Sequence, residues 1–138
     1  MIETKTLVFK TKSGTDIIDI TKEVSEEIKK SKINSGMVSV FVTGSTASIS
    51  TIEYESNLLK DMKRALERIA PEGGDYEHHK TWGDDNGSAH VRATLMKPGI
   101  TIPFKDKKLF LGTWQQVVLL DFDTRDRKRE IVLQIIGD

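Results

Sequence analysis

Hydrophobic and polar residues partly alternate in two short runs near the start of the chain, residues 4–10 and 15–20. Both runs are rich in β-branched residues, which favour extended strands. Ser13 and Gly14 stand between the runs and are residues typical of a turn. The pattern therefore predicts a β-hairpin at the start of the chain.

Two later segments show the period of an amphipathic helix, with lysines and glutamates on the polar face. In the first, Ile20, Val24 and Ile28 recur every four residues, and residues 34–36 (Asn-Ser-Gly) are expected to end the helix. The second is predicted to begin with Ser56 as its N-cap and to stop at the proline and glycines that follow it. Its apolar stripe consists of Leu58, Leu59, Met62, Leu66 and Ile69.

The remaining apolar runs predict strands, and together they indicate one α+β domain over residues 1–138 with antiparallel pairing, because strands joined by short turns pair in that way. Residues 37–43 are too apolar for an exposed edge and are expected to form a central strand. Residues 44–46 interrupt the chain between this strand and the following one. The segment 72–88 has no clean period, and residues 89–96 fit a strand or a short helix. The other predicted strands are residues 47–53, a hairpin of 100–104 and 109–111, and residues 116–122 and 131–136 joined by the turn 123–129.

The amino-acid composition limits the classes of function that this chain can have. The chain has 138 residues, with 21 lysines and arginines against 21 aspartates and glutamates, and this balance gives no support to a nucleic-acid partner. A hydrophobic fraction of 37% argues against disorder and against a membrane span. The absence of cysteine excludes thiolate chemistry and sulfur-bound zinc. No signal peptide is visible at the start, so we expect a cytoplasmic protein.

All three histidines lie in one polar segment, residues 76–90, together with Glu77, Asp84, Asp85 and Asn86. Two imidazoles and a carboxylate are a workable ligand set for a divalent zinc, iron or manganese ion. The spacing matches no standard metal motif, including the His-Glu-x-x-His and calcium-loop patterns. A polar surface loop whose carboxylates initiate turns is an equally good interpretation, so the pattern leaves both open.

A second candidate is the short sequence Thr43-Gly44-Ser45-Thr46, which directly follows the predicted central strand. Its hydroxyls and backbone N–H groups are suited to holding a phosphate. A β-bulge or a crossing between strands is the structural alternative, and no P-loop or dinucleotide glycine pattern occurs in the chain.

Three further places combine polar and aromatic groups. Glu53 ends an otherwise uncharged strand, where a carboxylate serves acid–base chemistry or simply reaches water. Trp114 is a candidate for the core or for a binding platform, and the adjacent Gln115 is a candidate polar contact. The four cations of residues 125–129 are expected at a solvated turn and only weakly indicate a phosphate or RNA patch.

These motifs occur in one order along nearly the whole chain, and the set resembles the YjbQ family, whose bacterial members are named secondary thiamine-phosphate synthases. The blocks Trp82-Gly-Asp-Asp-Asn-Gly87 to His90 and Leu111-Gly-Thr-Trp-Gln115 are the specific ones. Four others accompany them: Thr43-Gly-Ser-Thr-Ala47, Thr51-Ile-Glu53, Asp75-Tyr-Glu-His78 and Thr101-Ile-Pro103.

The resemblance implies a seven-stranded sandwich of two antiparallel sheets with two main helices, assembled as a homotrimer with sites near the subunit interfaces. It implies a polar site of His78 and His90 with Asp84 or Asp85, and it places Glu53 and the Ser45-Thr46 turn beside that site. Many members carry a His-Thr sequence at the positions of Gly44 and Ser45, so their third imidazole is absent here.

The leading hypothesis is weak thiamine phosphate synthase chemistry, in which a thiazole phosphate displaces pyrophosphate from a pyrimidine pyrophosphate. Glu53, Asp84 and Asp85 are the expected catalytic residues, and His78 and His90 are the expected ligands of a divalent zinc, magnesium or manganese ion. The expected substrate-binding residues are Gly44, Ser45, Thr46, Asn86, Trp114 and Gln115. The alternatives are a metal-dependent hydrolase of a small phosphorylated metabolite and a non-catalytic trimeric protein that binds a small anion. Under each hypothesis the partners are a small phosphorylated molecule or anion and further copies of the chain, without nucleic acid or membrane.

Overall fold

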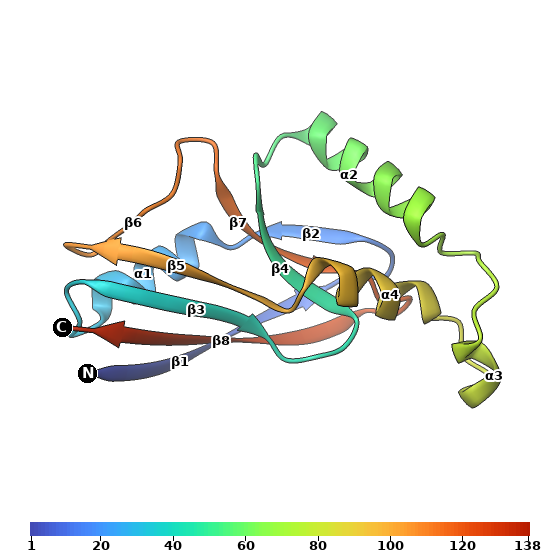
Figure 1. Ribbon diagram of the computed structural model, residues 1–138, viewed down its shortest axis with the longest axis horizontal. Helices are drawn as coiled ribbons and strands as arrows, with labels where there is room; N and C mark the ends of the chain where they lie inside the picture. The colour runs from blue at the N-terminus through green and yellow to red at the C-terminus, as the bar shows by residue number, and fades with distance from the viewer.

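The computed structural model describes residues 1–138 and contains two antiparallel sheets and four helices (Figure 1). The larger sheet has the strand order β1-β8-β3-β5-β6 and the smaller one β2-β7-β4. The strands are β1 (Ile2–Thr11), β2 (Asp16–Asp19), β3 (Gly36–Val42), β4 (Ala47–Ile52), β5 (Gly99–Lys105), β6 (Lys108–Leu109), β7 (Gln116–Asp121) and β8 (Arg127–Gly137). The helices are α1 (Thr21–Lys30), α2 (Ser56–Ile69), α3 (His78–Trp82) and α4 (Gly87–Met96).

The predicted α+β class and the antiparallel sheets are confirmed, while the counts differ from those that the resemblance implied. The structure has eight strands rather than seven, and the shortest, β6, has two residues. It has four helices rather than two, because the segment without a clean period contains α3 and the start of α4. Residues 89–96, which fitted a strand or a helix, belong to α4.

The predicted hairpin of the first two strands is wrong. β1 pairs with β8 in the larger sheet, whereas β2 pairs with β7 in the smaller one. The chain crosses between the sheets at Gly14, whose N–H donates to the carbonyl of Asp123 over 3.0 Å. Asp123 lies in the second crossing, between β7 and β8, so these two strands also belong to different sheets. The alternating pattern identified the strands correctly but carried no information about their partners.

Two apolar cores hold three layers together. The first contains 16 buried residues and lies between the sheets, where Val24 and Ile28 of α1 and the preceding Ile20 also pack. The second contains seven and joins the outer face of the smaller sheet to α2 and α4. β7 contributes to both, since Val117 and Leu119 face one core and Val118 and Leu120 face the other. Each fully buried aliphatic side chain of this kind contributes about 1.5–3 kcal/mol.

The helices α2 and α4 cover one side of the smaller sheet, and α3 lies at the end of the molecule opposite both termini (Figure 1). α2 begins at Ser56, but its N-cap is Glu55, whose carboxylate accepts hydrogen bonds from the N–H groups of Asn57 and Leu58. The expectation that Ser56 caps the helix is therefore wrong by one residue. None of the helices is long and apolar enough to cross a membrane.

Candidate functional site

The first candidate cluster lies where α3 and the start of α4 meet. Nε2 of His78 is 3.5 Å from Oδ2 of Asp84, and the ring of His78 meets that of His90 edge to face, with 4.5 Å between the ring centroids. His78 is the first residue of α3, and His90 lies one turn into α4. The sequence expectation that these three residues form one group therefore agrees with their placement.

Four side-chain atoms around the start of α4 are fully buried and have no hydrogen-bond partner. They are Nε2 of His78, Oδ1 of Asp84, Oδ1 of Asn86 and Oγ of Ser88. A buried polar atom without a partner carries a desolvation penalty of about 1–3 kcal/mol, so four in one place are unusual. Such a group favours a bound water, ion or polar ligand at this position. Ser88 was not among the residues that the sequence singled out.

Asp85, a predicted catalytic residue, and His79, the third histidine of the segment, are engaged elsewhere. Oδ1 of Asp85 accepts a hydrogen bond from Oγ1 of Thr124 over 2.8 Å, in the crossing between β7 and β8. Nε2 of His79 accepts the N–H of Gly87 over 3.0 Å, which holds α3 against the start of α4. The structure contains no group of three or more His, Asp or Glu side chains placed to hold a metal ion. The donor atoms of His78, Asp84 and His90 suit a divalent ion, but their arrangement does not form a three-ligand site.

A hollow of about 210 Å³ lies between the Gly44-Ser45 turn and α4, and we call it the His90 hollow. It is lined by Gly44, Ser45, Ala47, His90, Ala93, Thr94 and Pro98. The backbone N–H groups of Gly44 and Ser45 form no hydrogen bond within the chain. Gly44 has a φ of +148°, which an L-residue rarely adopts. Two predicted substrate-binding residues and one predicted metal ligand therefore share one hollow.

Thr46 occupies a different environment from the other residues of the turn, because it is buried in a charged network. Its Oγ1 accepts a hydrogen bond from Nη2 of Arg129 (2.6 Å) and donates to Oδ2 of Asp123 (3.1 Å). Arg129 is also paired with Asp121, to which Nε and Nη2 donate over 2.6 and 2.9 Å. Thr46 thus fixes the position of the turn and is not exposed to a ligand.

The surroundings of Asp123 within this network favour its ionised carboxylate. Burial opposes ionisation of Asp123, but hydrogen bonds from the Arg127 guanidinium, the Thr124 N–H and the Thr46 hydroxyl outweigh it and lower the pKa of that carboxyl below its ordinary value. Nε of Arg127 donates to Oδ2 of Asp123 over 2.8 Å. Asp123 therefore remains ionised at neutral pH.

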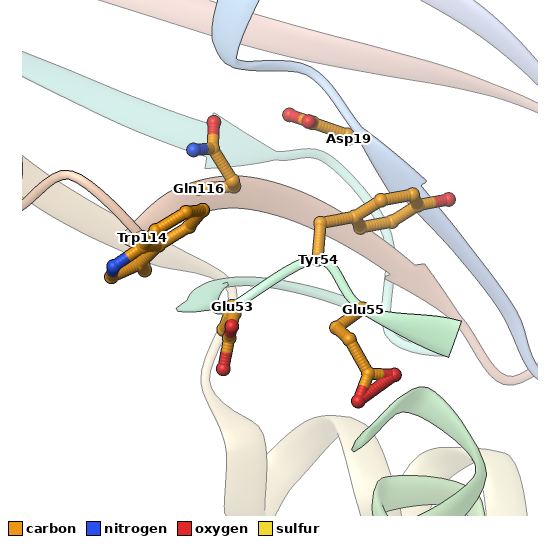
Figure 2. A pocket seen from close by; sticks show the side chains of 6 residues that line it. All are labelled: Asp19, Glu53, Tyr54, Glu55, Trp114 and Gln116. Atoms are coloured by element: carbon orange, nitrogen blue, oxygen red, sulfur yellow. The ribbon is translucent and has the colours of Figure 1, made fainter. Parts of the chain in front are cut away.

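Glu53 and Trp114 line a separate pocket of about 410 Å³, which we call the Glu53 pocket (Figure 2). Its other lining residues are Asp19, Tyr54, Glu55 and Gln116. Glu53 follows the end of β4, and its carboxylate makes no hydrogen bond, whereas Glu55 caps α2. Trp114 has 72% of its surface exposed, so the structure places it at the rim of a pocket and not in the core.

Gln115 does not face the Glu53 pocket. Its side chain accepts the N–H of Gly112 (3.1 Å) and donates to Oγ1 of Thr51 (3.2 Å), beside a smaller hollow. Within one chain the predicted site residues are thus divided among the His90 region, the Glu53 pocket and this smaller hollow, and the His90 hollow and the Glu53 pocket have no lining residue in common.

The whole length of the chain is similar to known proteins. A family model described as UPF0047 protein YjbQ-like matches residues 5–138. This match decides the family. The chain belongs to the YjbQ/UPF0047 family.

Relatives of this YjbQ-family chain are found in several organisms. A UPF0047 protein of Archaeoglobus fulgidus is 35% identical over 126 residues, which cover 91% of this chain and 96% of the relative. One of Methanothermobacter thermautotrophicus is 34% identical over 136 residues, covering 99% and 93%. Among solved structures, a hypothetical protein of Aeropyrum pernix gives a TM-score of 0.91 at 28% identity, covering 99% of both chains. A protein of unknown function from Sulfolobus solfataricus, described as YbjQ-like, gives a TM-score of 0.88 at 28% identity, and the match covers 100% of both chains.

Sequence reasoning missed two residues of the YjbQ-family site region, Arg129 and Ser88. Arg129 is the larger omission. It was grouped with the cations of a solvated turn, yet only 8% of its side chain is exposed. A signal was present in the strand period, since Arg129 is two residues before Ile131 and therefore shares its inward face. Ser88 carried no comparable signal, because small polar residues at the start of a helix are common.

Proposed function

We propose that this YjbQ-family chain binds a small phosphorylated molecule in the His90 hollow. The observation that carries the proposal is the pair of unpartnered backbone N–H groups at Gly44 and Ser45 beside the imidazole of His90. Successive backbone N–H groups and an imidazole are donors suited to phosphate oxygens. The hollow is large enough for a phosphate or pyrophosphate group but small for two joined rings.

The reaction that we propose is the thiamine phosphate synthase reaction implied by the family resemblance. The ring nitrogen of the thiazole phosphate attacks the methylene carbon of the pyrimidine pyrophosphate, the carbon–oxygen bond breaks, and pyrophosphate leaves with the bonding electrons. N–H and imidazole donors aimed at the leaving oxygens would stabilise the charge that develops there. The Glu53 pocket, with Trp114 and Tyr54, supports binding of an aromatic ring.

We propose further that the chain works as a homotrimer, which would allow the His90 hollow of one subunit to lie near the Glu53 pocket of another. The support is an apolar patch on the face of the larger sheet that points away from the core. Its exposed residues include Ile2, Met37, Phe41 and Ile136, and Ile136 pairs across the strands with both Ile2 and Met37. Light scattering of the full chain tests the assembly. A monomer at micromolar concentration would contradict it.

A direct assay tests the synthase proposal. Purified protein is incubated with both substrates and magnesium, and thiamine phosphate is measured by chromatography beside an active synthase. We expect product above background, a loss of about 100-fold with His90→Gln, and a smaller loss with Ser45→Ala. Ser50→Ala is the matched control, because the Ser50 hydroxyl makes no hydrogen bond, and it should leave the rate unchanged. Phosphate binding without product would favour the anion-binding protein. The absence of both phosphate binding and product would contradict the proposal.

A metal-dependent hydrolase is the second candidate, and the four buried atoms without partners around His78 and Asp84 favour it. A divalent zinc, magnesium or manganese ion bound by His78 and His90 would require a further ligand, and we assign no reaction step to it. Elemental analysis of untagged protein, followed by calorimetric titration with zinc and manganese, tests this candidate. We expect about one ion per chain and loss of binding with His78→Ala. Protein that is free of metal and does not bind either ion would exclude it.

A further inference from the structure

Four basic side chains surround a hollow where the end of β1 meets the start of β8. The hollow has a volume of about 460 Å³, and we call it the basic hollow. It is lined by Lys10, Thr11, Lys12, Asp126, Arg127 and Lys128. None of these residues lines the His90 hollow or the Glu53 pocket, so the basic hollow is separate from the site proposed above.

The register of the two strands brings like charges face to face. Lys10 stands directly opposite Lys128, and Thr11 stands opposite Arg127. Like charges directly opposite on an antiparallel pair are destabilising. The chain as a whole is neutral, with 21 basic and 21 acidic residues, so this concentration of positive charge is local. The arrangement does not help the fold, which indicates that the charges have another use.

The neighbouring carboxylates neutralise only part of the positive charge of the hollow. Lys10, Lys12 and Lys128 form no ion pair. Asp126, the single acidic residue of the lining, accepts the N–H of Ser13 over 2.7 Å. Arg127 donates from Nε to Asp123, which fixes the guanidinium at the edge of the hollow while 42% of its side chain stays exposed. Three lysines without an ion pair therefore face one carboxylate that is already hydrogen-bonded, beside an arginine that is paired with Asp123.

The lining also defines the kind of ligand. It contains no apolar or aromatic residue, so nothing in the hollow can stack on a base or bury a ring. Clustered lysines and an arginine bind phosphate groups strongly, and the volume lies in the range of small-molecule sites. We propose that the basic hollow binds a small anion with two phosphoryl groups, of which inorganic pyrophosphate is the simplest. A nucleic acid would need a longer basic track, for which the neutral chain gives no support.

Calorimetric titration of the full chain with inorganic pyrophosphate tests the proposal at a fixed ionic strength. We expect each of Lys10→Gln and Lys128→Gln to weaken binding about tenfold and the double variant to weaken it further. Lys5→Gln is the matched control, because Lys5 lies on the same strand outside the hollow and should leave the affinity unchanged. The Ser45→Ala/His90→Gln variant should retain this binding, which separates the basic hollow from the His90 hollow.

The temperature of thermal unfolding is a second measurement, and it distinguishes a variant that binds pyrophosphate more weakly from one that does not fold. Without ligand, the double variant should unfold at the same or a higher temperature than the wild type, because opposed like charges are removed. Pyrophosphate should raise the unfolding temperature of the wild type and the Lys5→Gln variant more than that of the double variant. Three results would overturn the proposal: an unchanged affinity in the double variant, equal competition by sulfate, or displacement of pyrophosphate by an oligonucleotide that binds more tightly.

Discussion

Arg129 of β8 donates a hydrogen bond from Nη2 to Oγ1 of Thr46 over 2.6 Å, and this contact joins the larger sheet to the residue that precedes β4 of the smaller one. The same guanidinium is paired with Asp121 of β7. It also packs against the Gly44-Ser45 turn, since a Cβ on Gly44 would come within 2.8 Å of Nη1 of Arg129. The buried network thus sets the position of the turn that lines the His90 hollow.

Replacement of Arg129 by methionine should destabilise the fold strongly. The carboxylate of Asp121 would stay buried without its cation, and breaking a buried pair in this way costs about 3–5 kcal/mol. Equilibrium unfolding in urea measures the change in the free energy of unfolding. Arg125→Met is the control, since Arg125 is exposed and forms no ion pair, and it should change the stability little. A similar small effect of both substitutions would mean that the network does not stabilise the fold.

The pKa of Asp123 predicts how stability depends on pH. Its pKa is lowered in the folded state from the ordinary value of 3.8, because the hydrogen bonds from Arg127, Thr124 and Thr46 outweigh the effect of burial. The unfolded chain therefore binds more protons at this group as the pH falls below about 5. The stabilisation is present above pH 3.8 and is lost as the pH falls through the folded-state pKa.

Asp123→Asn should consequently flatten the acid side of the stability profile, which urea unfolding between about pH 3 and pH 6 measures. Asp61→Asn serves as the control, because Asp61 is an exposed carboxylate on α2 with only a long contact of 3.9 Å to Arg64. Its profile should follow that of the wild type. If the Asp123→Asn profile falls as steeply as that of the wild type, another carboxylate governs the acid limb.

Individual helices and strands of this fold were predictable, because the spacing of apolar residues that indicates each one lies within its own residues. The four-residue period of Ile20, Val24 and Ile28 located α1, and the apolar run of residues 37–43 located the central strand β3. Strand partners were not predictable in the same way. Whether β1 meets β2 or β8 depends on the crossing at Gly14, where a backbone N–H finds a carbonyl more than a hundred residues away.

The candidate site was predictable only as a set of residues. Histidine and aspartate clustering pointed to His78, Asp84 and His90, which the structure brings together. Side-chain direction within an irregular segment has no period, so nothing indicated that Asp85 would turn to Thr124. The separation of the Glu53 pocket from the His90 hollow is likewise a property of how the sheets pack.

The N-terminus of α2 allows a direct comparison between sequence and structure. Glu55→Ala should lower the free energy of unfolding by about 1 kcal/mol, because its carboxylate accepts the N–H groups of Asn57 and Leu58 at the positive end of the helix dipole. Ser56→Ala should have little effect, since the Ser56 hydroxyl makes no hydrogen bond. Thermal unfolding of the two variants measures the difference. A larger effect at Ser56 would show that the cap lies where the sequence pattern predicted it.

Lys97 and Lys107 share a backbone feature but differ in what their side chains do. Both have a positive φ, of 74° and 65°. Lys97 follows α4, has a ψ of 151°, and its exposed side chain forms no hydrogen bond or ion pair. Lys107, in contrast, donates from Nζ to the carbonyl groups of Ser31 and Ile33. A non-glycine residue with the angles of Lys97 carries about 1–3 kcal/mol of strain.

Lys97→Gly should therefore stabilise the protein by about 1 kcal/mol, because the relief of strain exceeds the added entropy of the unfolded chain. Lys107→Gly should destabilise it, because the loss of two hydrogen bonds from a charged donor outweighs the gain from placing glycine at a positive φ. Urea unfolding of both variants under one set of conditions measures the two signs. A loss of stability with Lys97→Gly would show that the Lys97 side chain makes a stabilising contact, for instance with a phosphate held in the neighbouring His90 hollow. Repeating the measurement with added phosphate would then distinguish such a contact from one within the chain.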